Sequence, residues 1–204
     1  MAGPATTDIG LLLAREPRGE SHQSLGVLAR DHGYLTLMRR LPSRRGKLST
    51  NDAADLFDTA ELAWAPRTQF VESYRVLNRR VGLASSYRHL EAACTLARWL
   101  AGNLPHMAAD PARLALAETA FNALTAHHDP PACLFKTLYV LLRDEGYAVR
   151  EDWLRQLPRD SRVAVRTLLE TPLATHDPAA VDGVSLLENL RRWAVATTDL
   201  LLPV

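Results

Sequence analysis

The sequence predicts an α+β fold, in which a small all-β domain is followed by a helical domain. Two periodicities carry this prediction: apolar residues repeat with period two over residues 8–76, as in half-buried strands, and with a period near 3.6 from about Gly82 onward, as in amphipathic helices. The 204 residues include 47% hydrophobic and 23% charged side chains. This composition is average for globular proteins, so we expect a packed core.

The β-region contains four segments whose sequence pattern predicts strands. Alternating apolar residues predict strands at residues 24–29 and 34–38, joined by the turn Asp31-His32-Gly33, where Gly33 supplies the positive φ that tight turns need. A preceding strand is predicted at residues 9–15 and a later one at residues 67–76. Residues 52–64 are ambiguous, because Ala, Asp and Glu are poor strand formers and Leu56, Ala60 and Trp64 stand at helical spacing. Propensity alone favours a helix there.

The helical region is divided by capping signals. Asp110-Pro111 and Asp129-Pro130 each place an N-cap acceptor before a proline at the first helical position, which predicts two helix starts. Residues 83–101 predict an earlier helix, and Ser185-Leu-Leu-Glu188 is a capping box that opens a last helix to about residue 201. Shorter helices are predicted at residues 151–156 and 159–170. The expected buried stripe of the first helix is Leu83, Tyr87, Leu90, Cys94, Ala97 and Ala101.

Charge is distributed unevenly along the chain. The net charge is +1, but residues 1–80 carry 12 basic and 9 acidic residues, whereas residues 81–204 carry 12 and 14. One basic cluster stands out, in a stretch without acidic residues: Arg39, Arg40, Arg44, Arg45 and Lys47. A cationic loop beside a sheet can bind nucleic-acid phosphates, and Tyr34 on the predicted outward face of the same strand could stack on a base. The alternative interpretation is a solvated arginine loop.

Signals of catalysis, metal binding and membrane insertion are weak. The sequence holds no Walker, G-x-G-x-x-G or G-x-S-x-G motif, and the acidic pairs at helix ends are typical of solvated surface charge. We therefore expect no enzyme activity and no cofactor. Cys94 and Cys133 are expected to be small buried side chains rather than zinc ligands. Apolar runs are too short to span a membrane, and residues 1–10 lack a secretory signal, so the expected location is the cytoplasm.

Several segments, in order, resemble one family. Residues 9–13, then Arg18-Gly19-Glu20-Ser21, then residues 28–35 are similar to the opening of RecO recombination-mediator proteins. Val71-Glu72-Ser73-Tyr74 with residues 83–105 resembles the family's passage from its last barrel strand into its helices. Residues 135–147 resemble the helix that ends in L-G-Y. The resemblance extends over nearly the whole chain.

This resemblance implies an N-terminal five-stranded OB-fold barrel at residues 1–78 and a helical domain at residues 79–204. The family fold requires a strand within residues 52–64, although the propensities of these residues favour a helix. It also implies a role in recombinational DNA repair: binding single- and double-stranded DNA, annealing strands and assisting RecA loading. The implied partners are RecR and the C-terminal tail of single-strand-binding protein, and the implied location is the nucleoid.

The chain departs from the family pattern in two informative ways. Many relatives carry a four-cysteine zinc module after the G-Y position, whereas residues 148–158 contain no cysteine, so we expect no zinc. His22 stands where the family's turn usually has Asp. These departures leave open a second function, a protein-interaction adaptor that holds the tail of single-strand-binding protein and binds little DNA. A hydrolase activity is a third, weaker alternative.

Overall fold

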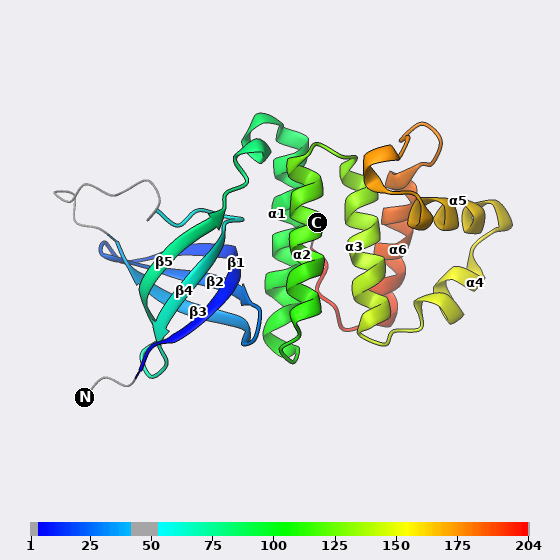
Figure 1. Ribbon diagram of the computed structural model, residues 1–204. Helices are drawn as coiled ribbons and strands as arrows, with labels where there is room; N and C mark the ends of the chain where they lie inside the picture. Colours follow the sequence, from blue (N-terminus) through cyan, green and yellow to red (C-terminus); the bar gives the residue numbers. More distant parts are fainter. Residues whose placement is uncertain (1–3, 42–52, 204) are drawn as a thin grey trace. The chain divides into compact units, whose positions relative to one another are not determined.

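The computed structural model describes residues 4–41 and 53–203 (Figure 1). It contains an N-terminal closed barrel of five strands followed by helices, so the predicted α+β fold with an OB-like barrel is confirmed. The strands are β1 (Thr6–Arg18), β2 (His22–Ala29), β3 (Gly33–Arg40), β4 (Thr59–Ala65) and β5 (Phe70–Asn78). The longer helices are α1 (Tyr87–Asn103), α2 (Pro111–Thr125), α3 (Pro130–Asp144), α5 (Arg159–Glu170) and α6 (Gly183–Thr197).

The chain packs as two compact units. Met1–Arg80 and Ala97–Glu118 form the first, and Val81–Leu96 and Thr119–Val204 form the second. The domain boundary predicted at residue 78 lies two residues before the first of these breaks, while residues 97–118 return to the unit that holds the barrel. The two-domain assignment at that boundary stays a prediction.

The barrel follows the order β1-β2-β3-β5-β4 around its circumference. Neighbouring strands are antiparallel except β3 and β5, which run parallel and complete the closure. Alternate side chains of the strands turn inward, as the period-two pattern predicts. The interior is filled by apolar residues from all five strands, including Leu12, Leu25, Val27, Leu37, Ala60, Leu62, Trp64 and Tyr74.

The ambiguous segment contains a strand, as the family resemblance implied, and its described residues, 53–64, do not form the helix that propensity favours. β4 occupies Thr59–Ala65, and the described residues before it form turns and coil. Ala60, Leu62 and Trp64 are buried at every second position and pack in the barrel interior. Pairing with β1 on one side and β5 on the other outweighs the poor strand propensity of these residues.

The β2–β3 turn has the predicted geometry and is held in place by polar contacts. Gly33 has φ of 70°, a left-handed conformation that favours glycine. The carboxylate of Asp8 in β1 accepts hydrogen bonds from the backbone N–H of Asp31 at 2.9 Å and contacts His32 Nδ1 at 2.8 Å. These contacts tie the turn to the neighbouring strand.

Residues 97–118 contact the barrel at several points. The 3₁₀ turn Leu104–His106 contacts β3, and Thr59 Oγ1 donates a hydrogen bond to Glu118 Oε1 at 2.7 Å. A Cβ on Gly33 would lie 3.2 Å from the Cα of Ala109. This segment is therefore an integral part of the barrel's unit.

The second unit is organised around α3, which contacts α5 and α6. Ten residues of α3 are buried. The rings of Phe135 and Tyr139 lie 6.1 Å and 6.3 Å from that of Trp153, which belongs to a π-helical turn, Val149–Trp153, preceding the short α4 (Leu154–Gln156). Both α2 and α3 begin at the prolines that the capping signals predicted.

Two predictions about helices were wrong in detail. The last helix is capped by Asp182 rather than Ser185, because the Asp182 carboxylate accepts hydrogen bonds from both the backbone N–H and the hydroxyl of Ser185. On α1, Tyr87 is 77% exposed and does not belong to a buried stripe. The buried apolar residues of α1 form a different set, namely Ala92, Ala93, Leu96, Ala97, Trp99 and Leu100.

Candidate nucleic-acid interface

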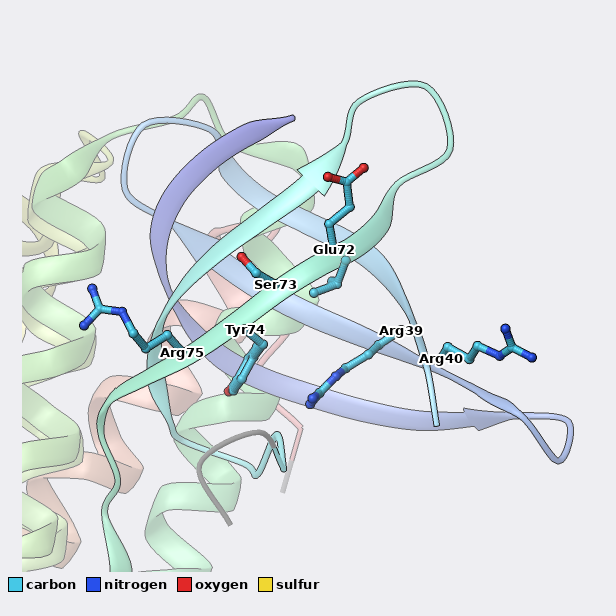
Figure 2. A pocket seen from close by; sticks show the side chains of 7 residues that line it. Arg39, Arg40, Glu72, Ser73, Tyr74 and Arg75 are labelled. Atoms are coloured by element: carbon cyan, nitrogen blue, oxygen red, sulfur yellow. The ribbon is translucent and has the colours of Figure 1, made fainter. Parts of the chain in front are cut away.

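The seam between β3 and β5 is the weakest join of the barrel. The two strands share a single residue pair, Met38 with Phe70, supported by a hydrogen bond from the Met38 N–H to the carbonyl of Gln69 at 2.8 Å. Next to this pair lies a groove of about 530 Å³ (Figure 2). It is lined by residues of both strands: Arg39, Arg40, Val71, Glu72, Ser73, Tyr74 and Arg75.

Arg39 and Arg40 reach different surfaces of β3. Successive side chains of a strand point to opposite faces, and Figure 2 shows the two arginines extending in opposite directions. The Arg39 guanidinium lies over the ring of Tyr74, with its carbon 5.0 Å from the ring centroid. Such a cation–π contact contributes on the order of 0.5–2 kcal/mol and orients the guanidinium. Arg40 is exposed.

Tyr74 is fixed beneath Arg39 by a buried carboxylate. Its hydroxyl donates to Asp58 Oδ2 at 3.4 Å. Burial, followed by the charge of Asp58, raises the pKa of Tyr74 above its usual range, so its phenol stays neutral. Asp58 is fully buried and is paired with Arg79, whose Nε and Nη2 lie 3.0 Å and 2.8 Å from the carboxylate oxygens. The ring that carries Arg39 is therefore anchored to the barrel interior.

The remaining charges of the groove are partly compensated. Arg75 pairs across β4 and β5 with Glu61, donating from Nε at 2.9 Å and from Nη2 at 2.7 Å. Glu72 supplies one carboxylate, which points away from Arg39 in Figure 2. The residues that line the groove include three arginines and one carboxylate, so basic side chains outnumber acidic ones in its lining. Guanidinium groups bind phosphate oxygens bidentately, so the arrangement is suited to a polyanion.

The predicted site residues are not all brought together. Tyr34 lies at the opposite end of β3 from Arg39, five residues away, which corresponds to roughly 16 Å along a strand. It is half-buried, and its hydroxyl lies over Gly26, where an added Cβ would be 2.1 Å away. Burial, then the charge of Glu16, raises the Tyr34 pKa. Three of the predicted cations lie outside the described residues: Arg44, Arg45 and Lys47.

Sequence reasoning missed the contribution of β5 to the groove. Tyr74 and Arg75 belong to a segment that was predicted only as a strand, and nothing local distinguishes them as binding residues. Their proximity to Arg39 depends on barrel closure between β3 and β5, which are about 30 residues apart in sequence. The one signal of this proximity was the predicted closed barrel, combined with the alternation of side chains along its strands.

No protein-family model matches the sequence, and the curated proteins give no significant match.

Across residues 4–41 and 53–203, no group of three or more His, Cys, Asp or Glu side chains is placed to hold a metal ion. Within the same ranges, no helix combines the length and the apolar character needed to cross a membrane.

Proposed function

We propose that this protein binds DNA in recombinational repair, with a role similar to that of the RecO mediators. In this proposal it binds single- and double-stranded DNA, anneals complementary strands and assists RecA loading in the nucleoid. RecR and the C-terminal tail of single-strand-binding protein are its proposed partners. The observation that supports the proposal most is the groove of the five-stranded barrel, where Arg39 is held over Tyr74 and Arg40 is exposed beside it.

Phosphate binding by these arginines has a measurable signature. Each phosphate neutralised on a single strand releases condensed counterions, which contributes about −0.7 to the slope of log K against log salt. If all five clustered cations contact phosphates, the slope is about −3.5. The groove itself accounts for two of these contacts, through Arg39 and Arg40.

The test is fluorescence anisotropy with a labelled single-stranded oligonucleotide over a series of salt concentrations. The double substitution Arg39→Gln with Arg40→Gln is expected to weaken binding and to make the slope shallower by about 1.4. Arg30→Gln is the matched control, because Arg30 is exposed at the opposite end of the β2–β3 hairpin. An unchanged affinity and slope in the double variant would contradict the assignment of the groove.

The mediator role requires a further measurement, since many DNA-binding proteins do not anneal strands. Complementary oligonucleotides labelled as an energy-transfer pair report annealing, and we expect the wild-type protein to accelerate it. The Arg39→Gln, Arg40→Gln variant is expected to lose this acceleration in proportion to its loss of binding. Binding without any acceleration of annealing would limit the function to DNA binding.

An adaptor function is the second candidate, and an exposed apolar surface on α1 supports it. Tyr87 is 77% exposed and Leu90 is 36% exposed. Residues three apart lie on one helix face, and the exposed Arg88 is adjacent. Apolar side chains beside a cation suit an acidic, apolar peptide such as the tail of single-strand-binding protein. Calorimetry with that peptide, beside anisotropy with an oligonucleotide, separates the candidates, because tight peptide binding without oligonucleotide binding favours the adaptor.

A further inference from the structure

The outer face of the barrel carries a row of side chains across β2, β3 and β5, next to the groove. His22 of β2 is paired with Arg40 of β3, and Met38 of β3 is paired with Phe70 of β5. Paired residues share a face of the sheet, and Met38 and Arg40 share it because they are two residues apart. All four side chains therefore lie on one surface, which we call the outer row.

Two aromatic rings meet within the outer row. The centroids of the His22 and Phe70 rings are 5.6 Å apart, with an interplanar angle of 81°. This edge-to-face contact fixes the orientation of both rings. This contact also crosses the seam between β3 and β5, because Phe70 belongs to β5 whereas His22 belongs to β2, the neighbour of β3 on its other side.

Phe70 is 38% exposed, whereas the interior apolar side chains of the barrel are almost fully buried. Exposed apolar side chains are common on protein surfaces and carry no meaning singly. Here the exposed ring lies in the same row as Arg40, an exposed cation. An oriented aromatic ring beside a guanidinium is the combination that binds a nucleotide, since the base stacks on the ring while the phosphate pairs with the cation.

We infer that the outer row is a subsite for one unpaired nucleobase, which stacks on Phe70 while its phosphate binds Arg40. The inference rests on the proposed binding of nucleic acid and adds the part of the strand that this surface recognises. In a duplex the faces of each base are covered by stacked neighbours, so Phe70 contributes only to a single strand. The subsite therefore favours single-stranded over double-stranded nucleic acid, whereas Arg39 and Arg40 bind the phosphates of both.

The experiment compares Phe70→Ala with Leu77→Ala by anisotropy, using a single-stranded oligonucleotide, the corresponding duplex and an oligonucleotide of abasic residues. Leu77 is the matched control because it is an apolar residue of the same strand with similar exposure, 43%. Loss of one stacked base costs about 1–3 kcal/mol, so Phe70→Ala is expected to weaken single-strand binding by about 5- to 150-fold. Duplex affinity and the salt slope are expected to stay unchanged, as is all binding by Leu77→Ala.

A second variant tests whether Phe70→Ala acts through loss of the aromatic ring or through a general disturbance of the seam. Phe70→Trp keeps an aromatic ring, so it is expected to retain single-strand affinity, and its indole fluorescence should be quenched by the normal oligonucleotide but not by the abasic one. Equal single-strand affinities of Phe70→Ala and Leu77→Ala would overturn the inference, as would wild-type affinity for the abasic strand equal to that for the normal strand. If the wild-type protein binds no oligonucleotide at all, the proposed function itself fails.

Discussion

Asp58 shows how much of the groove depends on a residue buried in the barrel. Its carboxylate is fully buried and accepts hydrogen bonds from Arg79, from the backbone N–H of Asp55 at 3.0 Å and from the hydroxyl of Tyr74. A buried carboxylate is tolerated only when its charge and its lone pairs are matched in this way. The orientation of Arg39 over the Tyr74 ring thus originates in the barrel interior.

Removing this carboxylate is expected to destabilise the protein strongly. Asp58→Ala removes the carboxylate with which Arg79 pairs, and breaking a buried ion pair costs about 3–5 kcal/mol of unfolding free energy. Because the Arg79 side chain is 31% exposed, we expect a value near the lower end of that range. Urea unfolding measures the change.

Glu61→Ala is the control for this measurement. It removes the Glu61–Arg75 pair, whose side chains are 48% and 66% exposed, and exposed pairs contribute less than about 1 kcal/mol. Similar losses in the two variants would contradict the central role assigned to Asp58.

Among the elements, the barrel strands are joined to very different extents. β2 pairs with β1 and with β3 over eight residue pairs each, whereas β3 and β5 share one pair. Local opening in proteins begins where backbone hydrogen bonds are few and exposed. The seam between β3 and β5 is therefore the part of the barrel most readily opened.

Hydrogen–deuterium exchange is expected to reveal this difference. A peptide covering residues 70–74 of β5 should exchange faster than one covering residues 24–29 of β2, because β2 is paired along both edges. Mass spectrometry of the free protein measures both peptides in one experiment. Equal protection of the two would show that the seam is held by contacts other than the strand ladder.

The elements also show what the sequence could and could not predict. Turns and helix starts were predictable where one residue determines the geometry, as with Gly33 and with the prolines that open α2 and α3. β4 was ambiguous because Ala60 and Trp64 satisfy both a helical and an alternating pattern, and only pairing with β1 and β5 distinguishes them.

The site was predicted less completely than the fold, for a geometric reason. Arg39 and Arg40 appear as one cluster in sequence, and both line the groove, but strand alternation points them in opposite directions, so that only Arg40 also belongs to the outer row. Tyr74 and Phe70 are brought to them by barrel closure, an interaction between distant segments that no local pattern encodes. Tyr34 fits the predicted outward position but lies at the other end of its strand, over Gly26.

At the scale of the whole molecule, the compact unit that holds the barrel extends beyond the first 80 residues. Residues 97–118 belong to the same compact unit, and Glu118 receives the hydrogen bond of Thr59 and lies 3.9 Å from Arg80 Nη2. Arg80 is itself almost fully buried. A fragment that ends at residue 80 would lack one partner of each of these contacts.

Fragments test this organisation. A fragment of residues 1–80 is expected to lack a cooperative unfolding transition, whereas a fragment of residues 1–126, which retains α1 and α2, is expected to show one. Near-ultraviolet circular dichroism, which reports the packing of Trp64 and, in the longer fragment, of Trp99, follows the transition in both. Cooperative unfolding of the shorter fragment would show that the barrel folds without residues 97–118.

Because a single residue pair closes the barrel between β3 and β5, the stability of the fold is expected to depend on whether a ligand is bound across this seam. A molecule that bridges β3 and β5 in the folded protein, and has no affinity for the unfolded chain, stabilises the fold by RT ln(1 + [L]/Kd), about 2.7 kcal/mol at a concentration of one hundred times Kd. The thermal midpoint then rises with ligand concentration whatever the ligand is. The melting temperature is therefore a label-free measure by which candidate ligands of the seam can be ranked.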